Sequence, residues 1–145
     1  MGTVSRRHIL IIEDDDALIK LLRTTLELAD YEVHTVRCGT TALLCAADIH
    51  PDLVILDLGL PDMNGYDVCR KLHQSSSGGA VPPILVLSGL SEPEDQRRGF
   101  ECGADAYLMK PADLGELRKT VGLLLEKSAS ASPNELHDPL NPTSA

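Results

Sequence analysis

The sequence predicts an α/β protein with a doubly wound sheet of five parallel strands and helices on both faces. Five short apolar runs alternate along the chain with five segments of helical periodicity. This alternation is typical of a parallel sheet, because each strand needs a crossover before the next can run in the same direction. The third run, residues 53–56 (LVIL), is apolar without a break, as expected for a strand that helices cover on both faces.

The first half of the chain supplies two strands and two helices before that central run. Residues 8–12 (HILII) form the first predicted strand, and a helix follows over residues 17–29. Its leucines are expected to give mostly one apolar face: Leu18, Leu21, Leu22, Leu26 and Leu28. Residues 31–36 alternate between apolar and polar, which is typical of an edge strand, and a short helix over residues 41–48 comes next.

The second half repeats the pattern after the central strand. A helix over residues 64–73 is followed by the loop SSSGGAVPP and by a fourth strand at residues 84–87. The next helix, residues 92–102, stops at Gly103, where a left-handed C-cap favours glycine. A fifth strand at residues 106–109 leads to a last helix over residues 113–127, for which Asp113 is a good N-cap.

These elements divide the chain into three regions. Residues 8–127 form the folded domain, and residues 1–7 form an N-terminal arm. Residues 128–145 contain three prolines and few apolar side chains, so we expect a disordered tail or linker there.

Composition excludes several classes of function. The formal net charge of −9 repels phosphate backbones and anionic lipids, which argues against binding of nucleic acid or membrane surfaces by this chain. The apolar run near the N-terminus is too short for a signal peptide or a membrane span. Because there is no Trp and one Phe, the core must be aliphatic.

The cysteines and histidines show no metal-binding spacing. The cysteines form no C-x-x-C pair and have no histidine partners nearby: Cys38, Cys45, Cys69 and Cys102. This argues against a zinc site and a disulfide framework, and favours buried or half-buried thiols in a reducing cytoplasm. The five histidines are scattered, so we interpret them as surface or filler residues.

Polar side chains follow four of the five strands at the point where each strand ends. They are Glu13 and Asp14 after the first strand, Asp57 after the third, Ser88 after the fourth and Lys110 after the fifth. Ligands of doubly wound sheets bind at the carboxyl ends of the strands. These side chains are therefore predicted to surround one shallow pocket.

Three carboxylates in one pocket require a cation. Neighbouring strands lie about 4.8 Å apart, and two unit charges about 4 Å apart repel by about 4 kcal/mol at an effective dielectric constant of about 20. Lys110 offsets only one charge, so we expect a divalent ion with oxygen ligands, Mg²⁺ rather than Zn²⁺, with Mn²⁺ as an alternative. A carboxylate beside Mg²⁺ and a lysine can accept a phosphoryl group, which makes Asp57 the candidate nucleophile and Lys110 and Ser88 its candidate stabilisers.

At these residues the sequence resembles a response-regulator receiver domain of bacterial two-component signalling. The resemblance covers residues 8–127 and rests on four motifs: the pair Glu13-Asp14, DLVILDLGLPDMNG around Asp57, LSG with Ser88, and DAYLMKP with Lys110-Pro111. It implies the (βα)5 flavodoxin-like receiver fold, with strand order 2-1-3-4-5 as in chemotaxis receivers.

The resemblance also implies a phosphoacceptor function in the cytoplasm. Asp57 would receive a phosphoryl group from a sensor histidine kinase or a histidine phosphotransfer protein. Mg²⁺ would be held by Glu13 or Asp14, by Asp57 and by the backbone carbonyl of Gly59. On this view the protein is a signalling module with autodephosphorylation at most, and not a turnover enzyme.

A conformational switch is the second implication of the resemblance. Ser88 would move toward the phosphoryl group, and Tyr107 would turn inward behind it. The bond between Lys110 and Pro111 would be cis, against a base rate of about 5–6% for X-Pro bonds. The last two helices and the fifth strand would form the output surface, and a homodimer through that surface is left open.

Two other functions compete with this reading. A Mg²⁺-dependent phosphohydrolase of the haloacid-dehalogenase type would want a second acid two residues after Asp57, where this chain has Gly59. A degenerate receiver would bind partners without phosphorylation, but the full set of polar residues argues against it. Taken singly, Asp57 could cap a turn, and the acids of residues 13–16 could be N-terminal helix acids, which explains Asp15 and Asp16 better than Glu13 and Asp14.

Overall fold

One parallel five-stranded sheet forms the centre of the protein. The computed structural model describes residues 6–74, 81–89 and 93–130. Within these residues the strands are β1 (His8–Ile12), β2 (Glu32–Val36), β3 (Leu53–Leu56), β4 (Ile84–Ser88) and β5 (Ala106–Met109). They lie side by side in the order β2-β1-β3-β4-β5, which confirms the predicted fold class and strand order.

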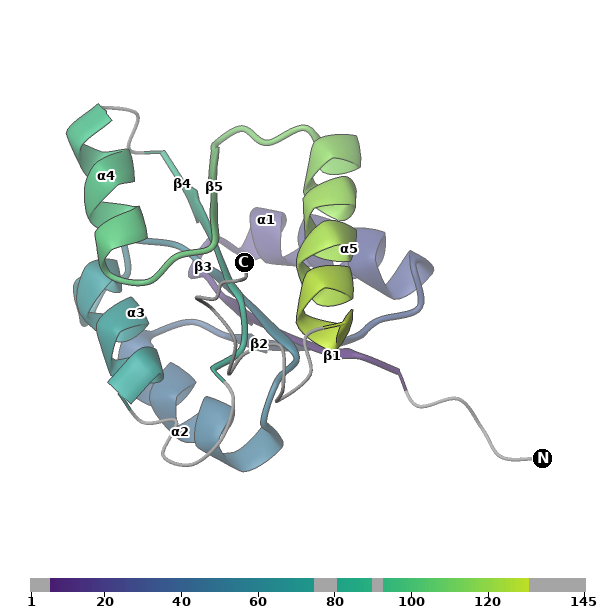
Figure 1. Ribbon diagram of the computed structural model, residues 1–145, viewed down its shortest axis with the longest axis horizontal. Coiled ribbons are helices and arrows are strands. Elements are labelled where there is room, and N and C mark those ends of the chain that lie inside the picture. The colour runs from purple at the N-terminus through teal and green to yellow at the C-terminus, as the bar shows by residue number, and fades with distance from the viewer. Residues whose placement is uncertain (1–5, 75–80, 90–92, 131–145) are drawn as a thin grey trace, which may run out of the picture.

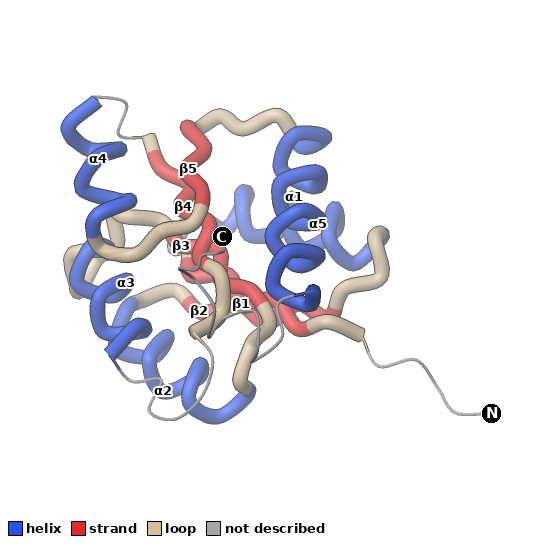
Figure 2. Tube along the Cα trace, in the orientation of Figure 1, coloured by secondary structure: helices blue, strands red, loops and turns tan. Residues whose placement is uncertain are grey.

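Helices cover both faces of this sheet. They are α1 (Asp16–Leu28), α2 (Gly39–Ile49), α3 (Gly65–Gln74), α4 (Pro93–Glu101) and α5 (Leu114–Ser130). Figure 1 shows α1 and α5 together on one side of the sheet and α2, α3 and α4 on the other. The tube in Figure 2 shows the same three layers, with the strands between two groups of helices.

The alternation of side chains along β1 produces two separate aliphatic cores. Ile9 and Ile11 pack in the cluster that contains buried residues of α1 and α5. Leu10 and Ile12 pack in the cluster that contains buried residues of α2 and α3. Successive side chains of a strand point to opposite faces, so a central strand that is apolar at every position contributes to both cores.

The apolar face predicted for the first helix is correct only in part. Leu22 and Leu26 are fully buried, and Leu18 is half-buried in the same cluster. Leu21 is 48% exposed and Leu28 is 80% exposed, so their assignment to that face is wrong. The buried leucines recur every four residues along one stripe, whereas positions 21 and 28 fall about 100° and 120° from its centre at Leu22.

Helix ends follow the capping residues that the sequence offers. Asp15 accepts hydrogen bonds from the backbone N–H groups of Ala17 and Leu18, at 3.0 and 3.3 Å, which confirms its interpretation as an N-terminal helix acid. Asp113 caps α5 through the N–H of Glu116, at 3.0 Å. Gly103 follows α4 with φ of 115°, and a Cβ there would collide with the ring of His73.

The last helix is longer than predicted. It continues to Ser130, three residues beyond Lys127, because residues 128–132, between Lys127 and Pro133, include no proline or glycine. The rest of the predicted tail, residues 131–145, lies outside the described residues, as do residues 1–5 of the predicted arm and residues 75–80 of the predicted loop. None of the helices in the described ranges combines the length and apolar character that crossing a bilayer requires.

Candidate functional site

The carboxyl ends of β1 and β3 bring Glu13 and Asp57 side by side. Ile12 pairs with Leu56 in the sheet, so the next residues of the two strands leave it at the same level. The backbone N–H of Asp57 extends the ladder by donating to the carbonyl of Ile12 at 3.0 Å. Two acidic side chains thus lie at the same edge because two parallel strands end in register.

The carboxyl ends of β4 and β5 bring Ser88 and Lys110 to the same edge. Ser88 pairs with Met109, and the backbone N–H of Lys110 donates to the carbonyl of Ser88 at 2.8 Å. Ser88 is buried, with 1% of its surface exposed. The peptide bond between Lys110 and Pro111 is cis.

Lys110 joins the two buried carboxylates. Its Nζ lies 3.0 Å from Oε1 of Glu13 and 3.4 Å from Oδ2 of Asp57. Glu13 is 2% exposed and Asp57 is 7% exposed, whereas about a quarter of the Lys110 side chain remains accessible. One ammonium group therefore serves two acids that are largely removed from water.

Backbone N–H groups complete the hydrogen bonding of these acids. Oε2 of Glu13 accepts from the N–H groups of Asp14 and Asp15, at 3.2 and 3.1 Å. Oδ1 of Asp57 accepts from the N–H of Gly59 at 3.2 Å. Each oxygen of the two carboxylates thus has a donor within reach, and their orientation is fixed by the chain itself.

The environment shifts the protonation of both partners of the closest ion pair. Burial raises the pKa of Glu13 above its ordinary value, and the charge of Asp57 adds to this, although Lys110 and the Asp15 N–H oppose it. Burial alone would lower the pKa of Lys110, but its hydrogen bond to Glu13 and the charge of Asp57 raise it overall. Lys110 is therefore charged at neutral pH, while ionised Glu13 is held at an energetic cost.

The arrangement of the acids suits a hard divalent cation. One carboxylate oxygen from each of Glu13, Asp14 and Asp57 lies within 4.8 Å of the other two. Glu13 and Asp57 are buried, and Asp14 is exposed, so the group opens to solvent on one side. All three donors are oxygens, which is the ligand type that Mg²⁺ prefers. The residues present therefore fit Mg²⁺.

Gly59 leaves the approach to Asp57 open. It is exposed, and a Cβ placed on it would meet nothing nearer than Oδ1 of Asp57, at 4.0 Å. Gly65, the first residue of α3 where this loop ends, packs so tightly against the backbone of Leu58 that a side chain there would collide with it. The loop after Asp57 is thus tightly packed at its far end and open beside the carboxylate.

Sequence reasoning missed the role of Asp62 in holding this loop. Its carboxylate accepts hydrogen bonds from the N–H groups of Gly39 and Thr40, at 2.7 and 3.0 Å, and from the Thr40 hydroxyl at 2.7 Å. These bonds, that of the hydroxyl first, lower the pKa of Asp62 to about 2. The sequence does hold one indication of this role, because the residue at the N-cap of α2 is Cys38, which makes no side-chain capping bond. The first N–H groups of the helix therefore need an acceptor from another part of the chain.

Tyr107 lies apart from the carboxylates. It pairs with Val86, two residues before Ser88, and is half-buried in the core cluster on the α2–α3 side. A Cβ on Gly99 of α4 would come within 3.0 Å of its ring, and its centroid lies 6.4 Å from that of Phe100. The ring therefore fills the contact between β5 and α4, behind the edge at which the polar side chains gather.

Comparison with known proteins finds one family throughout the folded region. Residues 9–122 match the model of the response regulator receiver domain. The chain is 41% identical over 133 residues to the KDP operon transcriptional regulatory protein KdpE of Escherichia coli, covering 89% of this chain and 56% of KdpE. It is 38% identical over 121 residues to the DNA-binding dual master transcriptional regulator RpaA of Synechocystis, covering 83% of this chain and 50% of RpaA.

A solved structure agrees with this result. A CheY-like response regulator receiver domain protein from Methanospirillum hungatei superposes with a TM-score of 0.82 at 27% identity, covering 88% of this chain and all of that one. The chain thus matches whole receiver domains, and it spans about half the length of the two regulators.

Proposed function

The chain belongs to the response regulator receiver domain family, and we propose that it accepts a phosphoryl group on Asp57 in a Mg²⁺-dependent reaction. The donor is a phosphohistidine on a sensor histidine kinase or a histidine phosphotransfer protein. The observation that carries the proposal is the position of Lys110, within 3.4 Å of a buried Asp57 and 3.0 Å of a buried Glu13.

Asp57 acts as the nucleophile in this proposal. A carboxylate oxygen attacks the phosphorus atom, a P–O bond forms, and the P–N bond to the donor breaks with its electron pair returning to the imidazole nitrogen. The hydrogen bond from the Gly59 N–H holds the carboxylate in place, and the open space beside Gly59 admits the donor. Phosphoryl transfer depends mainly on such positioning and on stabilisation of charge.

The neighbouring side chains stabilise the transferred group. Glu13, Asp14, Asp57 and the backbone carbonyl of Gly59 would hold Mg²⁺, which offsets the negative charge of the acids and of the phosphoryl oxygens when it is bound. The Lys110 ammonium, already beside Asp57, remains to pair with a phosphoryl oxygen. Ser88 is at the same edge and supplies a hydroxyl group.

The output surface in this proposal is the face formed by α4, β5 and α5. Each of these elements carries one exposed large apolar side chain: Phe100 on α4, Met109 on β5 and Leu123 on α5, exposed by 50%, 46% and 56%. Movement of Ser88 toward the phosphoryl group, followed by Tyr107 at the β5–α4 contact, would alter this face and its binding of a partner or of a second copy. KdpE and RpaA are named as transcriptional regulators, so we propose that DNA contacts of the whole regulator are made outside this acidic domain.

Intact mass after incubation with acetyl phosphate tests the proposal. Wild-type protein with Mg²⁺ should gain the mass of one phosphoryl group, and EDTA should prevent the gain. Asp57→Asn should gain nothing, whereas the matched variant Asp48→Asn, at an exposed carboxylate on α2, should behave as wild type. A gain in Asp57→Asn, or none in wild type, would overturn the proposal and favour the phosphorylation-independent receiver.

A further inference from the structure

The amino end of the sheet carries a second polar cluster, far along the strands from Asp57. His8 and Glu32 are the first residues of β1 and β2 and pair with each other in the sheet. His34 lies two residues farther along β2. Residues two apart in a strand, and residues opposite each other in a parallel pair, point to the same face. The register therefore places all three side chains on one face of the sheet edge.

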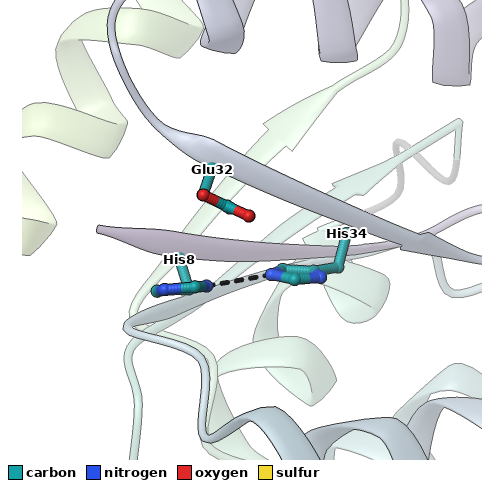
Figure 3. A group of neighbouring side chains, drawn as sticks. All are labelled: His8, Glu32 and His34. Atoms are coloured by element: carbon teal, nitrogen blue, oxygen red, sulfur yellow. Dashed lines mark hydrogen bonds between the residues drawn. The ribbon is translucent and has the colours of Figure 1, made fainter. Parts of the chain in front are cut away.

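The ring nitrogens of the two histidines lie within reach of one ion. Nδ1 of His8 and Nε2 of His34 are 2.9 Å apart, and the rings are nearly parallel, with an interplanar angle of 15°. Figure 3 shows the two rings joined by this contact, with Glu32 beside them. One ring nitrogen of each histidine and one carboxylate oxygen of Glu32 lie within 4.8 Å of one another.

From this geometry we propose that His8, His34 and Glu32 form a binding site for a divalent transition-metal ion of the Zn²⁺ type. Imidazole nitrogens suit Zn²⁺, Cu²⁺ and Ni²⁺, unlike the all-oxygen set around Asp57. Two nitrogens bound to one tetrahedral Zn²⁺ at about 2.0–2.1 Å stand about 3.4 Å apart. Binding therefore requires the rings to separate by about 0.5 Å and to turn until both nitrogen lone pairs point at the ion. Water fills the fourth position, because two of the ligands are half-buried and the carboxylate is exposed.

The backbone around His8 is held on both sides before any ion binds. The N–H of His8 donates to Oδ2 of Asp52 and its carbonyl accepts from the N–H of Asp52, each at 2.7 Å. On the other side, the N–H of Glu32 donates to the carbonyl of Arg7 at 2.9 Å. The ligands thus sit on strands whose spacing is fixed, and the Asp52 carboxylate adds negative charge to the same corner.

Binding would join the edge strand β2 to β1 at the end of the sheet opposite Asp57. The ion would stabilise the folded state, since the unfolded chain does not bring together residues 24 and 26 positions apart. The site is separate from the phosphoacceptor proposal and does not depend on it.

Isothermal titration calorimetry of the full chain with ZnCl₂ tests the site. Saturating Mg²⁺ is present throughout to occupy the acidic group around Asp57. Wild type should bind one equivalent, and ZnCl₂ should raise its Tm. His34→Gln and His8→Gln should each weaken binding at this site by about 100-fold or more, because loss of even an outer partner of a metal ligand costs about 10–100-fold. The control His50→Asn removes an exposed histidine in a left-handed position that asparagine tolerates, and should bind as wild type.

Two further measurements keep the outcome decisive. With Co²⁺ in place of Zn²⁺, the absorption spectrum should lack the thiolate charge-transfer band that binding by the cysteines would give. Without metal, the far-UV circular dichroism spectrum of His34→Gln should equal that of wild type, which shows that the variant is folded whether or not either protein takes up a phosphoryl group. Binding that survives in His34→Gln, a thiolate band in wild type, or no saturable equivalent would each overturn the site and leave the phosphoacceptor proposal intact.

Discussion

Neutralising Glu13 should stabilise the protein in the absence of a divalent ion. At an effective dielectric constant of about 20, Lys110 at 3.0 Å attracts ionised Glu13 by about 5–6 kcal/mol, and Asp57, within 4.8 Å, repels it by about 3.5 kcal/mol or more. The remaining attraction of about 2 kcal/mol is smaller than the several kcal/mol that burial of a charged group costs. The raised pKa of Glu13 agrees with this estimate, because it also means that the folded state disfavours the ionised carboxylate.

We therefore expect Glu13→Gln to raise the free energy of unfolding by about 1 kcal/mol in EDTA at neutral pH. Glutamine keeps an oxygen for the N–H groups of Asp14 and Asp15. Its NH₂ group then takes the place of Oε1 and cannot accept from Lys110, so the ammonium group turns to Asp57 alone. The pKa of Glu13 is higher in the folded state than in the unfolded state. The contribution of protonated Glu13 to the free energy of unfolding is therefore fully present only below the unfolded pKa, and it is lost as pH rises through the folded pKa. The advantage of the variant should thus grow with pH and vanish below about pH 4.

Magnesium should reverse this order. An ion at about 100 times its dissociation constant stabilises the folded state by about 2.7 kcal/mol, and the variant lacks one ligand and gains less. Urea denaturation in EDTA and in Mg²⁺ measures both effects, with Glu126→Gln on the exposed side of α5 as the charge-matched control, expected to change stability by less than about 0.5 kcal/mol. Destabilisation of Glu13→Gln in EDTA, or equal stabilisation of both proteins by Mg²⁺, would refute the reasoning.

Three more predictions concern the loop, a helix end and the lysine. Asp62→Ala should lower Tm at neutral pH, because the N-terminus of α2 loses its hydrogen-bond acceptor. The difference in Tm from wild type should persist above about pH 4 and close as pH falls toward the Asp62 pKa of about 2, whereas a difference independent of pH would contradict this reason. Gly103→Ala should cost more than about 1 kcal/mol in urea denaturation, from the left-handed backbone and the collision with His73, and an unchanged midpoint would remove that reason. Lys110→Ala should still take up phosphoryl label but should not change the NMR signals of α4 and β5 on phosphorylation, whereas a normal change would exclude Lys110 from switching.

The sequence predicts the fold and the main site because both depend on where strands end. A buried parallel strand is apolar at every position, so the first polar residue after it shows where the strand ends. Glu13, Asp57 and Lys110 are such residues, and the structure joins them in ion pairs. Parallel strands of one sheet end at one edge, which brings these residues together without knowledge of any contact. The exposure of Leu21 and Leu28 was not predicted, because a list of leucines does not say which stripe of α1 faces the sheet.

The remaining features depend on register and on loop geometry. His8 and His34 are 26 residues apart and show no metal-binding spacing, so the sequence alone gave them no role; only the pairing of β1 with β2 brings their rings within 2.9 Å. Asp62 and Thr40 meet because a loop folds back onto the start of another helix. Local patterns carry no information on such contacts.

The central claim is that Asp57 itself carries the phosphoryl group, and trapping that bond tests it most directly. Borohydride reduces an aspartyl phosphate to homoserine, which peptide mass spectrometry assigns to a single residue. After labelling with acetyl phosphate and Mg²⁺, homoserine should appear at position 57 and at no other acid. Homoserine at another position, such as Asp14, would contradict the account. The absence of homoserine from protein that has gained the mass of a phosphoryl group would contradict it as well.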